Sequence, residues 1–414
     1  MTADLLVVGG GVAGVTTAVE AAEAGLQVVL VERLPYLGGR VAQFNHYFPK
    51  MCPPSCGLEI NFRRLRDSEN VQIFTLTDLN WINGEPGAYK ATLRVTPRYV
   101  KPDAMDYTEW AKSCPVEYDN EFDYGLSRRK ALYYPFENAF PPLWVVDERA
   151  VSDPIFREWA AGCPDGGLDL DQQPEEVHLE VKSVAWATGW QPYDAGRLEL
   201  LGYGTHPDVI TNVQMERLAA PNGPTGGKIR KLSGEGEVKS VAFVQCAGSR
   251  DENHLPYCSG VCCAASLKQA SYVREQLPEA EVHIFYIDIR TPGRLEDFYQ
   301  ARQEDEKIHL HRGKVAKVVP VDGGLAVTAE NTLTGDLETL TVDLVVLATG
   351  MQPAAKSEPP PLGLELDENG FAVQQDEAAG IYGVGTAVRP LNVAETLQDA
   401  TGAAMKALLM ARGA

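Results

Sequence analysis

Short apolar runs alternate with helical patterns in two separate parts of the chain. The first part has an apolar run at Leu5–Val8, an alanine-rich helical pattern, and a second apolar run from Gln27 to Val31. The second part has apolar runs at Lys239–Gln245 and Glu281–Ile287, with a helical pattern from about Ala264 to Glu275 between them. Strand, helix and strand in this order are typical of parallel α/β structure. The pattern therefore predicts two Rossmann-like units.

A glycine-rich turn joins the first predicted strand to its helix. Gly9, Gly11 and Gly14 form the pattern G-x-G-x-x-G, and Glu32 closes the second strand 18 residues after Gly14. Such glycines let a pyrophosphate approach the backbone at a helix N-terminus, and an acid at this distance can bind ribose hydroxyl groups. The sequence predicts a dinucleotide site here. The alternative is a glycine-rich turn without a ligand.

Length and charge narrow the class of protein. With 414 residues the chain is too long for one ordinary domain, so two or three are expected. A formal net charge of −20 makes nucleic acid and anionic membranes poor partners, whereas a basic protein partner stays possible. The N-terminus lacks a basic leader, and no apolar run approaches the roughly 18 residues of a membrane span. We expect a cytoplasmic protein, whose clustered cysteines serve metal or redox chemistry rather than structural disulfides.

A second glycine pair follows the predicted nucleotide site, in the stretch ERLPYLGGR at residues 32–40. This stretch resembles the second glycine signature of the flavoproteins with two dinucleotide-binding domains, the relatives of thioredoxin reductase and glutathione reductase. AWATGWQP at residues 185–192 and VLATGMQP at 346–353 are near copies, in agreement with two units of similar design. The resemblance implies an α/β fold with two Rossmann-like dinucleotide-binding domains, and FAD on the first.

The C-terminal stretch from GIYGVGTA to AMKAL resembles the last FAD-contacting strand and helix of the same flavoproteins. Their usual motif has Asp after Gly, whereas here Thr386 follows Gly385. Asn392 and Glu395 predict a capping box, whose helix N-terminus would stabilise an anionic reduced flavin; a capped surface helix is the alternative. The resemblance implies FAD contacts at Gly9, Gly11, Ala13, Gly14, Glu32, Arg33, Gly38, Gly39, Arg40, Gln43, Thr188, Gly189, Gly385, Thr386, Asn392 and Val393.

Half of the eight cysteines lie in the second unit, where a nucleotide-binding glycine turn would be expected. The first strand of that unit ends in CAGSRD, with Cys246 and a single glycine, Gly248, so NAD(P)H is poorly served. Cys258, Cys262 and Cys263 lie where the following helix begins. Four cysteines at one strand-to-helix junction can hold a [4Fe-4S] cluster. A zinc ion, or buried cysteines with a regulatory disulfide, are the alternatives.

The stretch from VQCAGSRD to DFYQ, residues 244–300, resembles the A subunit of heterodisulfide reductase, in which a C-x(n)-C-x3-C-C motif holds a non-standard [4Fe-4S] cluster. Through YLGGRVAQFN, YFPKMCPPSCGLEINFRR and its whole length, the chain is more similar still to the A subunit of the quinone-interacting membrane-bound oxidoreductase. This resemblance implies an oxidoreductase subunit with FAD and a cluster, which transfers electrons between adenylylsulfate reductase and the membrane quinone pool in sulfur metabolism. It also implies two partner subunits, one with flavin and iron–sulfur centres and one in the membrane, which would hold the cytoplasmic chain at the inner membrane.

Two Cys-Pro pairs, at Cys114 and Cys163, stand where bacterial ferredoxin motifs would end. Counting back by the C-x2-C-x2-C-x3-C-P spacing reaches mainly aromatic residues instead of cysteines. Residues 97–173 are therefore interpreted as a ferredoxin-like insertion that has lost its cluster ligands; two accidental Cys-Pro pairs are the alternative. The predicted units are residues 1–96, 174–205 and 359–414 for the FAD domain, 97–173 for the insertion, and 206–358 for the second Rossmann-like domain.

Cys52 and Cys56 keep three interpretations open. Disulfide-reducing relatives carry a redox cysteine pair beside the flavin shortly after the glycine pair, but here the cysteines are 13 and 17 residues beyond Gly39. They are a flavin-proximal dithiol, ligands shared with a partner subunit, or structural residues. The leading hypothesis for the chain is an electron-transfer subunit. The alternative is a free-standing flavin-dependent disulfide or sulfur reductase that uses this pair.

Overall fold

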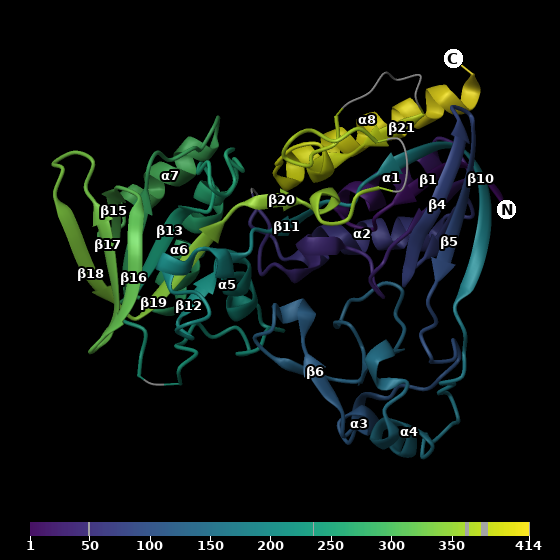
Figure 1. Cartoon of the computed structure of the whole chain (residues 1–414), viewed down its shortest axis with the longest axis horizontal. Coiled ribbons are helices and arrows are strands. Elements are labelled where there is room, and N and C mark those ends of the chain that lie inside the picture. Colours follow the sequence, from purple (N-terminus) through teal and green to yellow (C-terminus); the bar gives the residue numbers. More distant parts are fainter. Residues whose placement is uncertain (49, 235, 361–363, 374–379, 414) are drawn as a thin grey trace.

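The computed structural model describes residues 1–48, 50–234, 236–360, 364–373 and 380–413. Two α/β bodies lie beside each other, and an inserted segment extends from the first of them (Figure 1). The first body holds both ends of the chain, and the second is formed by the middle of it. Within the described ranges, no helix has the length and apolar character needed to cross a membrane.

The first body is built on a seven-stranded sheet in the order β3-β2-β1-β10-β5-β4, with β21 also paired to β10. Its strands are β1 (Thr2–Val8), β2 (Val28–Val31), β3 (Val71–Phe74), β4 (Thr77–Glu85), β5 (Ala88–Val95), β10 (Glu175–Trp186) and β21 (Ile381–Gly383). The β3, β2, β1, β10 and β21 strands are parallel, and Val8 is in register with both Val31 and Trp186. Their carboxyl ends therefore meet at one edge of the sheet.

Three helices, α1 (Val12–Glu23), α2 (Pro54–Asp67) and α8 (Val393–Arg412), pack on this sheet. Small side chains such as Ala18 of α1 and Ala400 and Ala407 of α8 are fully buried, so the two helices approach each other closely (Figure 1). Short 3-10 helices η1 (Gly39–Gln43), η6 (Ala354–Lys356) and η8 (Gly385–Ala387) lie in the connections. This packing brings the C-terminal helix to the first nucleotide-binding unit.

The second body has a five-stranded parallel sheet in the order β12-β19-β13-β14-β15. Its elements are β12 (Val209–Thr211), α5 (Asn212–Ala219), β13 (Ser240–Ala247), α6 (Cys262–Gln276), β14 (Glu281–Tyr286), α7 (Leu295–Gln303), β15 (Ile308–Arg312) and β19 (Leu344–Thr349). An antiparallel sheet of β16 (Val315–Val321), β17 (Gly324–Glu330) and β18 (Leu337–Val342) packs beside it. The predicted strands and helix of this unit lie within two residues of the observed ones, so the second Rossmann-like unit is confirmed.

The two near-identical sequence stretches pair with each other. β11 (Trp190–Pro192) follows β10, β20 (Met351–Pro353) follows β19, and the two form an antiparallel ribbon. The ribbon carries the chain out of the first body and back into it (Figure 1). The internal repeat is thus the point at which the two bodies are joined.

The inserted segment has a core of its own, rich in aromatic side chains. Its elements are α3 (Thr108–Ala111), β6 (Glu117–Asp119), η2 (Glu121–Asp123), β7 (Arg128–Lys130), β8 (Leu132–Tyr133), β9 (Val145–Val146), η3 (Glu148–Ala150) and α4 (Pro154–Ala160). The rings of Trp110 and Trp159 stack with centroids 3.9 Å apart, and Tyr107 and Phe156 are fully buried. Aromatic rings therefore fill the positions that a ferredoxin motif would give to cysteines. The ferredoxin-like origin of residues 97–173 stays a prediction.

Candidate functional site

Two glycine turns meet at the carboxyl edge of the first sheet. A Cβ atom on Gly14 would lie 1.8 Å from the carbonyl oxygen of Gly9, and one on Gly39 would lie 2.8 Å from Cα of Gly11. The backbone N–H group of Gly38 donates a hydrogen bond to the carbonyl group of Gly10 (2.8 Å). Only glycine permits these close approaches. They hold the N-terminus of α1 against the second turn, as a pyrophosphate site requires.

Glu32 is buried at the end of β2. Its carboxylate accepts hydrogen bonds from the backbone N–H groups of Gly10 (2.6 Å) and Leu34 (2.8 Å). Burial raises the pKa of Glu32, and these two hydrogen bonds oppose the rise. The carboxylate therefore fixes the glycine turn and stands where ribose hydroxyl groups are bound in dinucleotide sites.

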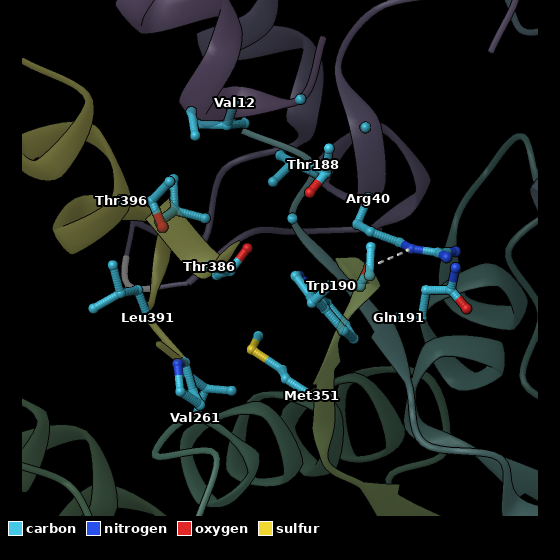
Figure 2. Close-up of a pocket in the computed structure, with 18 of the residues that line it drawn as sticks. Val12, Arg40, Thr188, Trp190, Gln191, Val261, Met351, Thr386, Leu391 and Thr396 are labelled. Atoms are coloured by element: carbon cyan, nitrogen blue, oxygen red, sulfur yellow. Dashed lines mark hydrogen bonds between the residues drawn. The ribbon is translucent and has the colours of Figure 1, made fainter. Parts of the chain in front are cut away.

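A cavity of about 1110 Å³ runs from the glycine turns to the N-terminal end of α6. Figure 2 shows side chains of both bodies around it, with Val12 and Thr386 from the first body and Val261 from the second. Most of the residues that the sequence assigned to FAD line this cavity, namely Gly9, Gly11, Ala13, Glu32, Arg33, Gly39, Arg40, Gln43, Thr188, Gly189, Thr386, Asn392 and Val393. The cavity is thus shared between the first glycine motif and the second body.

Gly14, Gly38 and Gly385, also predicted as FAD contacts, are not among the residues that line the cavity. Gly385 has φ +63°, and its backbone N–H group donates to the carboxylate of Asp399 (2.6 Å). A Cβ atom on Gly385 would lie 2.9 Å from Cβ of Ala13. These glycines shape the walls of the site by close packing. Asp399 had no sequence signal beyond its place in the C-terminal helix.

The polar groups around the cavity fit FAD. The predicted capping box is confirmed, because the Asn392 side chain accepts from the Glu395 N–H group (3.0 Å) and the Glu395 carboxylate accepts from the Asn392 N–H group (3.0 Å). The N-terminus of α8 thereby faces the cavity with its dipole favouring negative charge. Thr188 Oγ1 is buried and has no hydrogen-bond partner within the described part of the chain. A ligand rich in acceptors and hydroxyl groups would satisfy both.

Four cysteines gather at the carboxyl edge of the second sheet, as the sequence predicted. Cys246 lies in β13 with φ +54°, Cys262 and Cys263 are the first two residues of α6, and Cys258 precedes them. The thiols of Cys262 and Cys263 donate to the carbonyl groups of Thr349 and Asp288 (both 3.7 Å), which follow the strands on either side of β13. Cys258 Sγ accepts from the N–H group of Gly260 (3.3 Å). The sulfur atoms therefore spread over one edge of the sheet.

The thiols interact electrostatically as one group. Burial, and next the negative charge of Cys263, raises the pKa of Cys246 to about 11. Burial likewise raises the pKa of Cys262, and the other three cysteines raise it further. Among the described residues, no three His, Cys, Asp or Glu side chains are arranged as a ready metal site. The donor set and its position fit an iron–sulfur cluster, while the sulfur atoms are hydrogen-bonded to backbone groups instead of pointing to a common centre.

Two arginines beside the cysteines were missed by sequence reasoning. Arg250 pairs with Asp288 (2.6 Å), and Arg290 lies 3.4 Å from the same carboxylate and lines the cavity. The charge of Arg250 opposes the rise in the pKa of Cys246, and after its bond to Asp288 the charge of Cys258 raises the pKa of Arg290. Both cations can thus balance thiolate charge. The signal for Arg250 was its place within the stretch CAGSRD.

Cys52 and Cys56 lie away from the cavity. Cys56 is exposed in the first turn of α2, Cys52 is half-buried, and neither belongs to the cavity lining. After burial, the charge of Cys56 and a hydrogen bond between the two thiols raise the pKa of Cys52. The pair is therefore a surface dithiol, and the hypothesis of a disulfide reductase that uses it beside the flavin lacks support from the geometry.

A buried ion pair on the cavity wall had no sequence signal. Lys268 Nζ lies 2.8 Å from Glu216 Oε1, and their side chains are 4% and 3% exposed. Gln269 and Tyr272 donate further hydrogen bonds to the Glu216 carboxylate (2.6 and 3.3 Å). The lysine also donates to the carbonyl group of His46 in the first body (2.6 Å). Such a pair is costly to bury unless both charges are well bonded, as they are here.

Comparisons with known proteins identify the class. The model of the FAD dependent oxidoreductases matches residues 4–47, and that of the pyridine nucleotide-disulphide oxidoreductases matches residues 258–407. Thioredoxin reductase of Lactococcus lactis, in its FR conformation, superposes with a TM-score of 0.55 at 15% identity over the whole of both chains. Thioredoxin reductase of T. acidophilum gives 0.52 at 15% identity, over 100% of this chain and 98% of that one. The fold is that of an FAD-dependent pyridine nucleotide–disulphide oxidoreductase, and the chain is an oxidoreductase.

Relatives in sequence are more specific. The A subunit of the H(2):CoB-CoM heterodisulfide,ferredoxin reductase of Methanothermobacter thermautotrophicus is 34% identical over 418 residues, which cover 98% of this chain and 63% of that protein. The second of two A-type iron-sulfur subunits of the CoB–CoM heterodisulfide reductase of Methanopyrus kandleri is 35% identical, over 97% of this chain and 63% of that protein. The chain is a homologue of the heterodisulfide reductase A subunit, and it spans 63% of the length of these relatives. The predicted similarity to that subunit is confirmed, while the assignment to a quinone-interacting complex stays a prediction.

Proposed function

We propose that this chain is an electron-transfer subunit of a heterodisulfide-reductase-like complex, with FAD in the cavity and a [4Fe-4S] cluster on the four gathered cysteines. The position of the loop between Cys258 and Cys262 carries the proposal. Its residues Ser259, Gly260 and Val261 line the cavity that fits FAD, while the cysteines on either side of it belong to the predicted cluster site. A flavin and a cluster in these places would be neighbours across one loop.

The FAD part of the proposal rests on the first body. FAD would supply a redox centre that exchanges electrons singly or in pairs. The chain's own groups bind and orient it: the N-terminus of α1 faces the pyrophosphate, Glu32 binds ribose, and the N-terminus of α8 favours negative charge on the ring. The family models matched on residues 4–47 and 258–407 support the same cofactor.

The cluster part rests on the second body. Cys246, Cys258, Cys262 and Cys263 would hold the cluster, which supplies a one-electron centre. Three of these thiols are buried, and Arg250 adjoins them, so the charge of four thiolates would not stand uncompensated. A relative that carries the name of an iron-sulfur subunit supports this assignment.

The same junction argues against a nicotinamide nucleotide. In a Rossmann-like unit the turn after the first strand carries the glycines that admit a pyrophosphate. Here Cys246 ends that strand and Ser249 is buried in the turn, with Gly248 packed against the ring of Tyr193. The second body is therefore suited to a cluster and to electron exchange with other proteins.

We further infer the identity of the partners from sequence resemblance. The stretches YLGGRVAQFN and YFPKMCPPSCGLEINFRR support a place in a quinone-interacting membrane-bound oxidoreductase, between adenylylsulfate reductase and the quinone pool in sulfur metabolism. The partners are then adenylylsulfate reductase, a second flavin and iron–sulfur subunit, and a membrane subunit. With a net charge of −20, the chain would reach the inner membrane from the cytoplasm only through a partner.

Serine variants test the proposal. Cys262→Ser and Cys263→Ser should each reduce iron and acid-labile sulfide to a small fraction of the wild-type content while FAD stays bound, because the flavin lies on the other body. Cys163→Ser, in the inserted segment, is the matched control and should keep all three. Wild-type iron and sulfide in both cluster variants would contradict the proposal, and so would a native protein that carries only zinc.

A further inference from the structure

The inserted segment touches the flavin cavity at a single turn, η2 with Tyr124 after it. Glu121 of this turn lines the cavity. The turn is fixed from inside, because Asn120 accepts a hydrogen bond from the N–H group of Phe122 (3.1 Å) and donates one to Asp123 (3.0 Å). Tyr124 has φ +52°, an unfavourable backbone conformation for tyrosine that surrounding contacts must maintain.

The Tyr124 side chain holds two residues of the cavity wall. Its hydroxyl group donates a hydrogen bond to Gln43 Oε1 (2.7 Å) and accepts one from Arg40 Nη1 (3.3 Å). The Arg40 guanidinium lies 5.5 Å from the centre of the Tyr124 ring and also donates to the carbonyl group of Trp190 (3.3 Å). Burial raises the pKa of Tyr124, so the hydroxyl group stays a donor. Arg40 and Gln43 both line the cavity, and Figure 2 shows Arg40 extending along its wall.

Asp123 binds the second body. Its carboxylate pairs with Arg217 Nε of α5 (2.8 Å), and the two side chains are 6% and 1% exposed. The same guanidinium donates to the backbone carbonyl group of Gln43 (3.1 Å) and lies 4.6 Å from the centre of the Phe122 ring. Gln43 is therefore held twice, at its side chain by Tyr124 and at its backbone by Arg217. One turn joins the inserted segment, the first body and the second body.

We propose that Asp123 and Tyr124 are positioning residues that set the redox properties of the flavin by holding Arg40 and Gln43 in the cavity and the second body against it. This inference rests on FAD binding in the cavity, as proposed above. It gives the inserted segment a function that needs no cluster of its own. A cation and an amide held at a flavin change the relative affinity for its oxidised and reduced forms, since the two forms differ in charge and hydrogen bonding.

Two conservative tyrosine variants of the FAD-loaded full chain test Tyr124. Tyr124→Phe removes the hydroxyl group that bonds Gln43 and Arg40. Tyr118→Phe, in the same segment, removes a hydroxyl group without a hydrogen-bond partner among the described residues. We expect Tyr124→Phe to keep its FAD but to change the ratio of affinities for reduced and oxidised flavin threefold or more, a shift of about 14 mV in the midpoint potential. Its flavin absorption bands should also shift, while Tyr118→Phe matches the wild type.

Variants of the ion pair test the second contact. Asp123→Asn leaves Arg217 buried without a counter-charge, whereas Asp123→Asn with Arg217→Gln removes both charges. Small-angle X-ray scattering should show the bodies separating in the single variant and returning towards the wild-type profile in the double variant. A wild-type potential and spectrum in Tyr124→Phe would overturn the inference even if the bodies separate as expected. A wild-type protein that binds no FAD would instead overturn the proposed function, and this inference with it.

Discussion

Replacing Gly11 by alanine separates the binding of FAD from the stability of the fold. A Cβ atom there would meet nothing nearer than Cα of Gly39 at 3.9 Å, and φ −72° with ψ −174° is open to alanine. A weaker N-cap costs about 0.5–1 kcal/mol, and a stiffer unfolded chain returns a similar amount, so the free energy of unfolding of the apoprotein should change by less than about 1 kcal/mol. The new methyl group nevertheless stands at the N-terminus of α1, where the pyrophosphate must approach the backbone. We expect FAD affinity to fall on the order of 100-fold, or about 2.7 kcal/mol.

Gly14→Ala is the contrasting variant. Its Cβ atom would lie 1.8 Å from the carbonyl oxygen of Gly9, so α1 must move away from β1, at a cost of about 1–3 kcal/mol even without FAD. Urea denaturation of both apoproteins measures the stabilities, and titration with FAD, followed by its fluorescence, measures the affinities. Wild-type FAD affinity in Gly11→Ala would refute the assigned pyrophosphate site. Equal urea midpoints for the two variants would refute the distinction between a ligand-facing and a packing glycine.

Three further outcomes are expected. Calorimetry should find no low-micromolar affinity for NADH or NADPH in the isolated chain, because Cys246 ends the strand where a glycine turn would begin; such an affinity would contradict the account of the second body. Lys268→Met should lower the free energy of unfolding by about 3–5 kcal/mol, and adding Glu216→Leu should recover much of it, because a lone buried charge costs more than none; equal losses in the single and double variants would speak against a buried pair. Burial lowers the pKa of His283 to about 4, so the unfolded chain takes up this proton first, and urea midpoints should fall between pH of about 6.5 and about 4, less steeply in His283→Gln; parallel curves would contradict this.

The glycine turns, the capping box and the cysteine group could be predicted from the sequence because each is a local pattern. The spacing of Gly9, Gly11 and Gly14 fixes a turn within six residues, and Asn392 and Glu395 are one helical turn apart. Cys246 reaches the other three cysteines because a parallel strand and its following helix meet at the carboxyl edge of the sheet. Local spacing and one rule of α/β topology were sufficient.

The contacts between the bodies could not be predicted in this way. Asp123 and Arg217 are 94 residues apart, and Tyr124 and Gln43 are 81 apart, so no periodicity or motif connects them. Their pairing depends on how the inserted segment and the two bodies dock. The same reason explains Cys52 and Cys56, whose distance from the glycine pair left a place beside the flavin open, whereas the fold puts them on the outer side of α2.

The most direct test of the central claim is the cofactor content of the wild-type chain purified without oxygen. An absorption spectrum, combined with assays for FAD, iron and acid-labile sulfide and an electron paramagnetic resonance spectrum of the reduced protein, would measure both centres together. We predict FAD equimolar with the chain, about four iron and about four sulfide per chain, and a cluster signal that appears on reduction. FAD without iron, iron without FAD, or zinc in place of iron would contradict a flavin and a cluster held side by side.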